Sequence, residues 1–166
     1  MEQKTLVRRA VQEDGPCLLR LVEELARYEK LKAPDAEARS RLLADLFGPS
    51  PRLEALVGFS RGVPAGYAFF LETYSSFLAL PTLYLEDLFV LADHRESGLG
   101  SDLFLAAARE TRARGCGRME WAVLDWNTLA IRFYERRGAR HMKEWQLWRL
   151  TAGEMDALLG GRPSTG

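Results

Sequence analysis

The chain has 166 residues, of which 47% are hydrophobic and 28% are charged, and its formal net charge is zero. This length and composition are typical of one globular domain with a sizeable core, and they exclude a disordered or fibrous chain. The balanced charge excludes the basic surplus with which proteins bind nucleic acid or an anionic membrane. We therefore expect a single domain over residues 1–166, with residues 160–166 as a loose tail.

The two cysteines, Cys17 and Cys116, have no spacing that is typical of metal ligands. A single bridge between them stays open, but two reduced thiols in a cytoplasmic protein are the simpler interpretation. The segment from Met1 to Asp14 is too charged for a signal peptide, and no apolar run is long enough to span a membrane. We expect a soluble, cytoplasmic protein that binds neither a metal nor a membrane.

The first half of the chain predicts a strand, two helices and a hairpin. Apolar residues recur at helical spacing after Asp14-Gly15-Pro16, where proline suits a first helical turn. Arg61-Gly62 is a turn signal between two apolar runs. The expected elements are a strand over Thr5–Val11, helices over Asp14–Lys32 and Pro34–Phe47, and strands over Arg52–Ser60 and Val63–Thr73.

The second half alternates strands and helices. The expected elements are a strand over Leu83–Leu91, a helix from Gly98 to near Gly115, a strand over Met119–Trp126, a helix over Asn127–Arg137 that stops at Gly138, a strand over Met142–Leu150, and a short helix capped by Thr151 and ending at Leu159. This order predicts a mixed α/β fold in which helices cover a central sheet.

A glycine-rich loop, Arg95-Glu96-Ser97-Gly98-Leu99-Gly100-Ser101, joins a strand to a helix. Such a junction presents unpaired N–H groups at the positive end of the helix dipole, which suits a phosphate. Arg95 adds a cation and Ser101 a hydroxyl. By itself the loop fits a tight turn equally well. It is neither a Walker loop nor a complete dinucleotide fingerprint.

Residues Arg95–Gly100 follow the pattern Gln/Arg-x-x-Gly-x-Gly/Ala and so resemble the GNAT superfamily of acetyl-coenzyme A-dependent N-acetyltransferases. Four separated segments resemble, in order, the spermidine/spermine and thialysine N-acetyltransferases of that superfamily. They are Glu24–Glu29, Tyr84–Val90, Ala122–Asn127 and Phe133–Ala139. Several motifs in the same order are far more specific than the loop alone.

The resemblance implies a mixed sheet with two splayed central strands, and acetyl-CoA as co-substrate with no metal. It also implies a homodimer and a small-molecule amine as acceptor. The cofactor-binding positions that it implies are Leu88, Phe89 and Val90 for pantetheine, Arg95, Glu96, Ser97, Gly98, Leu99, Gly100 and Ser101 for the pyrophosphate, and Asn127, Tyr134 and Arg136 further along the chain.

Acetyl transfer requires a neutral amine, and alkylammonium groups have a pKa near ~10.4, so a base is needed. Glu86 is the candidate base, because it lies in an apolar strand where desolvation would raise its pKa. The alternative is that Glu86 only pairs with an arginine. Regular alternation places Asp87 on the opposite face, so Asp87 is predicted to be structural unless a bulge intervenes.

Tyr134 is the candidate acid that protonates the departing thiolate. Asn127 suits the N-cap of the helix, and Tyr134, seven residues on, falls on the same face. The alternative is a core aromatic beside Phe133. Tyr28 and Glu29 match positions that contact the amine in the similar enzymes.

Three departures from the family pattern concern charge. Glu96 replaces a small residue in the loop, Ser75-Ser76-Phe77 stands where polyamine enzymes carry an acid, and Gln146 replaces a glutamate. A polyamine, a diamine or a lysine-like amino acid all remain candidate acceptors. A protein amine as acceptor and a non-catalytic acyl-CoA-binding module are the alternatives. Trp121, Trp126, Trp145 and Trp148 are expected in the core or at a dimer interface.

Overall fold

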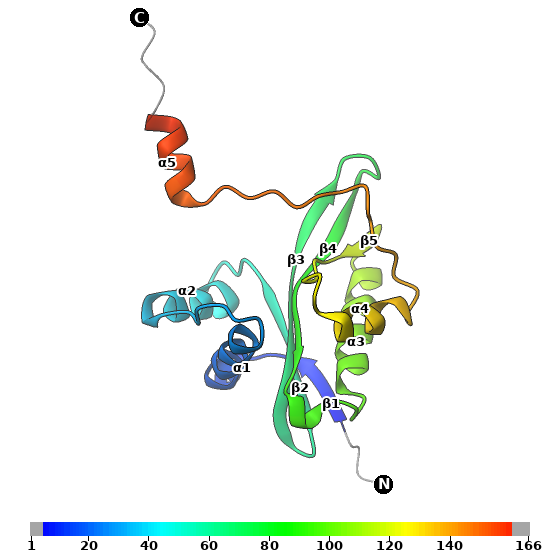
Figure 1. The fold of residues 1–166 in the computed structure, drawn as a ribbon. Helices are drawn as coiled ribbons and strands as arrows, with labels where there is room; N and C mark the ends of the chain where they lie inside the picture. The colour runs from blue at the N-terminus through cyan, green and yellow to red at the C-terminus, as the bar shows by residue number, and fades with distance from the viewer. Residues whose placement is uncertain (1–4, 161–166) are drawn as a thin grey trace, which may run out of the picture. The chain divides into compact units, whose positions relative to one another are not determined.

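The computed structural model describes residues 5–160, and its compact units divide between Ala122 and Val123. The helices and strands, labelled in Figure 1, are β1 (Thr5–Arg9), η1 (Gln12–Asp14), α1 (Gly15–Tyr28), α2 (Ala36–Phe47), β2 (Glu54–Ser60), β3 (Val63–Ser75), β4 (Leu80–Val90), η2 (Ala92–His94), α3 (Leu99–Ala113) and β5 (Arg118–Glu120) in the first unit, and α4 (Thr128–Glu135) and α5 (Ala152–Gly160) in the second.

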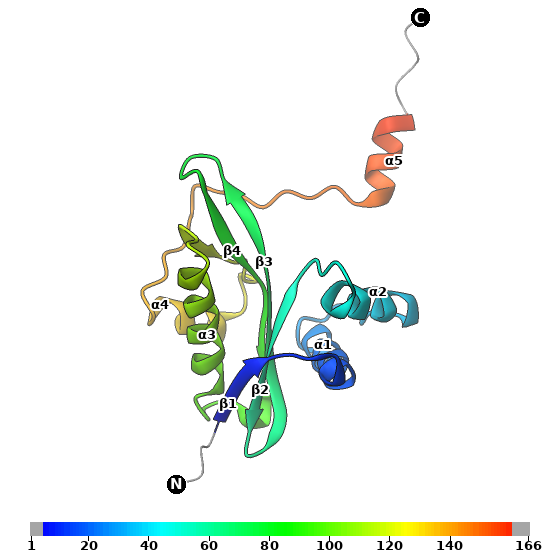
Figure 2. The same ribbon diagram turned by 180° about the vertical axis from the view of Figure 1, so that it is seen from behind.

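The first unit is built on a mixed sheet in the order β1-β2-β3-β4-β5. The first four strands pair antiparallel and β5 pairs parallel to β4, so α3 is the crossover that such a parallel pair requires. Helices α1 and α2 lie on one side of the sheet and α3 on the other (Figures 1 and 2). The predicted mixed α/β fold with helices on both faces is confirmed.

The core has one layer on each face of the sheet. On the α1 side, buried side chains of the helices meet those of the strands; the cluster is Leu18, Leu21, Leu46, Ala55, Val57, Tyr67, Phe69 and Phe89. On the α3 side, two glycines let the helix approach. A Cβ on Gly58 would lie 2.8 Å from Leu99 Cδ1, and one on Gly66 would lie 3.1 Å from Leu103 Cδ1.

Local turn and cap chemistry explains several boundaries. Arg61 and Gly62 both have positive φ, 51° and 78°, as a tight two-residue hairpin turn requires. The second helix begins at Ala36 because the carboxylate of Asp35 accepts a hydrogen bond from Ala38 N at 2.9 Å. The predicted hairpin is confirmed, and the second helix starts two residues later than predicted.

The second unit contains α4 and α5 and, among its described residues, no strand. The predicted strand over Met119–Trp126 forms only as far as Glu120, and the predicted strand over Met142–Leu150 is wrong. The latter segment has apolar side chains on both faces, but a strand gains its stability from a hydrogen-bonded neighbour, and none pairs with it among the described residues.

The tryptophans divide between the two units. Trp121 meets the ring of Phe104 edge-on, with 5.4 Å between centroids. Trp145 and Trp148 are 73% and 84% exposed, so the core alternative is wrong for them and the dimer-interface alternative stays a prediction. Thr151 and Glu154 form the predicted cap of α5, with Thr151 N donating to Glu154 Oε2 at 2.6 Å. Of the predicted tail, only Gly160 is described, and it ends α5.

Within residues 5–160, no group of His, Cys, Asp or Glu side chains is arranged to hold a metal ion. No helix in this described part of the chain is long and apolar enough to cross a membrane. Cys17 and Cys116 are both unbridged thiols.

Candidate active site

Strand β4 leaves β5 early and continues beside β3 alone. The β4–β5 pairing covers only Thr82–Tyr84, whereas the β3–β4 pairing extends to Val90. Leu91 N donates to Ala65 O at 2.9 Å, which makes the next pair along, Val90 with Gly66, a pair without mutual hydrogen bonds. The N–H and C=O groups of Leu88 and Val90 therefore point away from β3, toward the side that β5 has left.

The loop after β4 is held in a left-handed conformation at two positions. Gly98 is the N-cap of α3 with φ of 93°, and Glu96 has φ of 67°. A Cβ on Gly98 would meet nothing within 4 Å, so the backbone angle and not space requires glycine there. The first N–H groups of α3 have no acceptor within the helix, although Leu99 N also donates to Ser97 Oγ at 3.3 Å. This arrangement suits an anion, and the binding of the pyrophosphate by the loop stays a prediction.

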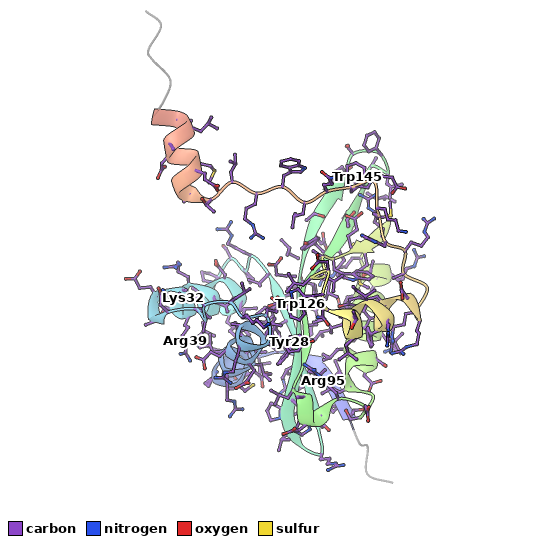
Figure 3. The ribbon with its side chains drawn as sticks, viewed as in Figure 1. Tyr28, Lys32, Arg39, Arg95, Trp126 and Trp145 are labelled. Atoms are coloured by element: carbon purple, nitrogen blue, oxygen red, sulfur yellow. The ribbon has the colours of Figure 1, made fainter. Side chains whose placement is uncertain are left out.

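Arg95 links this loop to β4 and to the end of α1. Its Nε donates to Val90 O at 3.1 Å, and its guanidinium lies over the Tyr28 ring, 4.8 Å from the centroid (Figure 3). Tyr28 was predicted to contact substrate and Arg95 to contact cofactor, so the structure brings the two predicted groups together. A surface hollow of about 240 Å³ lies against the same loop, with Arg61 of the β2–β3 turn on its other side.

A bulge in β4 changes which way the two predicted carboxylates face. Phe69 pairs with Asp87 but Phe70 pairs with Leu85, which leaves Glu86 as the extra residue. Asp87 consequently shares the α1 side of the sheet with Phe69, and the hydroxyl of Tyr67 donates to Asp87 Oδ2 at 2.9 Å. The bulge interrupts the regular alternation from which the opposite faces of Glu86 and Asp87 were predicted.

The less exposed carboxylate of this pair is Asp87, which is half-buried. Desolvation, together with the nearby charges of Glu86 and Glu29, raises the pKa of Asp87 to about 6, although the hydrogen bond from the Tyr67 hydroxyl acts to lower it. Burial also raises the pKa of Glu29, which caps the end of α1. Glu86 is exposed, so the expectation that it is desolvated is wrong. Sequence reasoning missed Tyr67 and the bulge, which no local motif announces.

Helix α4 carries the predicted residues of the second unit. Asn127 Oδ1 accepts from Ala130 N at 3.2 Å, which confirms Asn127 as the N-cap. Tyr134 is half-buried, its ring meets Phe133 edge-on at 5.3 Å, and burial raises its pKa to about 12. Arg136 is exposed at the end of the helix.

Comparison with known proteins identifies the class of this fold and loop. Residues 18–139 match the Acetyltransferase (GNAT) family, and the chain belongs to that family. GNAT acetyltransferases use acetyl-CoA, so the chain is an acetyl-CoA-dependent N-acetyltransferase. Its fold is similar to that of the aminoglycoside N-acetyltransferase AAC(6')-Iy solved in complex with CoA, with a TM-score of 0.73, 20% identity, and coverage of 88% of this chain and 94% of that one.

The sequence is also similar to two acetyltransferases whose names state their substrates. The chain is 33% identical to a thialysine N-epsilon-acetyltransferase of Sus scrofa over 161 residues, which cover 92% of this chain and 94% of the relative. It is 45% identical to an L-ornithine N5-acetyltransferase of Arabidopsis thaliana over 96 residues, which cover 58% of this chain and 42% of that enzyme.

Proposed function

We propose that this enzyme acetylates the primary amine of a small molecule that carries more than one charged group, such as a diamine, a polyamine or a lysine-like amino acid. One observation carries the proposal. At the bulge of β4 the Tyr67 hydroxyl donates to Asp87 Oδ2 at 2.9 Å, and the pKa of this hydroxyl is raised by burial and by the nearby carboxylates of Asp87, Glu29 and Glu86. A concentration of negative charge there attracts an ammonium group. The named substrates of the two relatives, thialysine and ornithine, are amino acids of this kind.

The residues of the first unit fit acetyl-CoA. The outward backbone groups of Leu88 and Val90, on either side of Phe89, suit an amide-bearing chain such as pantetheine. The loop from Arg95 to Ser101 suits the pyrophosphate, because α3 begins there with left-handed turns that expose N–H groups. When bound, acetyl-CoA supplies an acetyl group activated as a thioester.

The proposed roles of the side chains follow from their exposure to solvent and their protonation. Glu86, exposed at the bulge, contacts the incoming ammonium together with Tyr28 and Glu29. Tyr134 donates a proton to the thiolate, and its raised pKa keeps the phenol protonated at neutral pH. Asn127 and Arg136 complete the cofactor-binding set on and beside α4.

The proposal includes a single acetyltransferase domain, because the family match over residues 18–139 runs across the division at Ala122. It also includes a homodimer in the cytoplasm, where the two unbridged thiols of Cys17 and Cys116 would stay reduced.

The test is release of free CoA from acetyl-CoA with matched acceptors. Putrescine is compared with butylamine, ornithine with norvaline, and both with lysine-containing peptides. Turnover is expected with putrescine or ornithine and not with the partners that lack the second amine. Glu29→Gln is expected to raise KM for the good acceptor about tenfold, as loss of one partly buried attraction of ~1.4 kcal/mol would.

The matched control is Glu37→Gln, which removes an exposed carboxylate of α2 that pairs with Arg41 at 3.7 Å. It is expected to leave KM unchanged. If the protein binds CoA but no amine is acetylated, the proposed activity is wrong. Equal turnover of butylamine and putrescine would instead show that the carboxylates do not select the acceptor.

A further inference from the structure

The Tyr28 side chain lies at the border of the core, at the end of α1. It follows Leu21 and Leu25 at helical spacing, so it lies on the face of α1 that packs against the sheet, and its half-buried ring contacts the core cluster there. The helix ends at the next residue, where Glu29 N donates to Leu25 O at 2.9 Å. The core therefore fixes the base of the Tyr28 side chain, and the loop after β4 supplies a further contact to its ring.

Arg95 makes this contact from the first position of the glycine-rich loop. Its guanidinium carbon lies 4.8 Å from the centroid of the Tyr28 ring and 6.0 Å from that of the Phe89 ring. Its Nε donates to Val90 O at 3.1 Å, which fixes the direction in which the side chain leaves the loop. A guanidinium over a ring face is attracted by the negative face of the ring, and more strongly where it is partly desolvated, as half-buried Arg95 is. One side chain thus joins β4, the loop and the end of α1 (Figure 3).

The partners of Arg95 differ from those of an arginine that serves the fold. Arg114, also half-buried, donates to the carboxylates of Glu54 at 2.6 Å and Glu72 at 3.1 Å. Within residues 5–160, Arg95 forms no ion pair with a carboxylate, and the hydrogen bond to Val90 O is the one that its side chain makes. Rings and a backbone oxygen give a side chain a defined position without neutralising its charge. The contacts of Arg95 therefore suit a residue that holds a neighbour in place.

We propose, resting on the acetyltransferase function above, that Arg95 is a positioning residue for the acceptor amine and acts by holding the Tyr28 ring. Tyr28 contacts the amine, and Glu29, the next residue, brings its carboxylate to the same end of α1. Without the guanidinium the Tyr28 side chain has other rotamers open to it, so the loss is felt in binding of the amine. A residue that its motif assigns to the phosphate of one substrate thereby serves the binding of the other.

Positioning and plain electrostatics predict opposite signs for the loss of Arg95. Arg95 is a cation beside the place of an ammonium, so by Coulomb's law alone its removal lowers the KM for the amine. If Arg95 holds Tyr28, Arg95→Gln instead raises this KM about tenfold at saturating acetyl-CoA, while kcat stays within a few-fold of wild type. Arg95→Lys keeps a cation that can lie over the ring and should recover part of the loss. Calorimetric titration of the better acceptor of putrescine and ornithine into CoA-bound protein should give the same ratio without turnover.

A double-mutant cycle shows whether Arg95 acts through Tyr28. Tyr28→Leu removes the ring, and in this background Arg95→Gln should have no further effect on the KM for the amine. The matched control is Arg27→Gln, which removes a cation one residue from Tyr28 whose side chain is 71% exposed and paired with Glu24. This control should not raise the KM for the amine.

Circular dichroism and CoA titration show whether each variant is folded. If Arg95→Gln weakens CoA binding but leaves the KM for the amine unchanged or lowers it, Arg95 is a phosphate contact alone and the proposal is overturned. Additive effects of Arg95→Gln and Tyr28→Leu would overturn it as well. Absence of turnover with every amine in the wild-type protein overturns the proposed function too, whereas normal wild-type turnover with an unchanged KM in Arg95→Gln leaves that function standing.

Discussion

The bulge in β4 and the loop that follows this strand are two irregularities of one short stretch of chain. They differ in whether backbone groups or side chains give them their chemistry. The loop depends on backbone angles, with left-handed Glu96 and Gly98 opening α3. The bulge acts through side chains, because Asp87, next to the extra residue Glu86, accepts a hydrogen bond from Tyr67 there. Backbone N–H groups bind the same anion in any sequence that can adopt the angles, whereas carboxylates select by charge. The donor can therefore be shared across a family while the acceptor changes with a few residues.

The largest expected effect concerns Tyr134, the side chain proposed to protonate the thiolate of the acetyl donor. Tyr134→Phe should lower kcat about 100-fold, because the thiolate then lacks its acid, while the Kd of CoA stays within a few-fold of wild type. Steady-state kinetics and equilibrium CoA binding measure the two. Tyr74→Phe, at a 68% exposed tyrosine of β3, is the control. Full activity in Tyr134→Phe would show that Tyr134 does not protonate the thiolate.

The bulge should be revealed by the pH dependence of stability. The folded-state pKa of Asp87 is raised from 3.8 to about 6, so the protonated form is favoured by folding. This contribution is fully present below pH ~4 and is lost as pH rises through about 6. Asp87→Asn keeps a neutral group there and should therefore be more stable than wild type at pH 7, by about 2 kcal/mol, and equal to it near pH 4.

Urea unfolding of both proteins across this pH range gives the difference, in which the titrating groups that do not interact with Asp87 cancel. A difference that does not change between pH 4 and pH 7 would show that Asp87 is not buried as an acid.

The loop should respond to a single added methyl group. Gly98→Ala places a Cβ at φ of 93°, where it meets no atom but strains the backbone by about 1–2 kcal/mol. If the loop relaxes to escape this, CoA binding should weaken about tenfold while acceptor KM at saturating acetyl-CoA is unchanged. Gly153→Ala in α5, where the Cβ also meets nothing, is the control and should be neutral or stabilising. Unchanged CoA affinity would mean that the loop angles do not matter for the cofactor.

The sequence predicted the loop far better than the bulge. Glycines mark left-handed turns locally, so the turn at Gly98 and the helix that follows it could be predicted without a structure. A bulge depends on the register between two strands. The sequence of one strand alone does not predict that Phe69 pairs with Asp87 while Phe70 pairs with Leu85. This is why the burial expected for Glu86 is found at its neighbour.

One predicted strand is shorter than expected and another is wrong, and the reason for the second is the lack of a partner strand. The segment over Met142–Leu150 has a strand composition, but composition cannot supply a partner. Helix α4 and its cap at Asn127 were predictable because a helix satisfies its own hydrogen bonds.

The smallest expected effect has the opposite sign to Gly98→Ala and completes the comparison. Glu96 has φ of 67° and carries a negative charge in a loop proposed to bind a pyrophosphate. Glu96→Gly should remove the strain, and after the greater freedom of glycine in the unfolded chain is subtracted, a gain of about 0.5–1 kcal/mol in unfolding free energy remains. Glu96→Gln removes only the charge, so it should tighten CoA binding without raising stability.

The two variants together separate the effect of the backbone angle of Glu96 from the effect of its charge. Thermal unfolding measures the change in stability, and CoA titration measures the change in affinity. If Glu96→Gly raises neither stability nor affinity, the left-handed angle at this position carries no cost. The proposed anion site would then depend on the N-terminus of α3 alone.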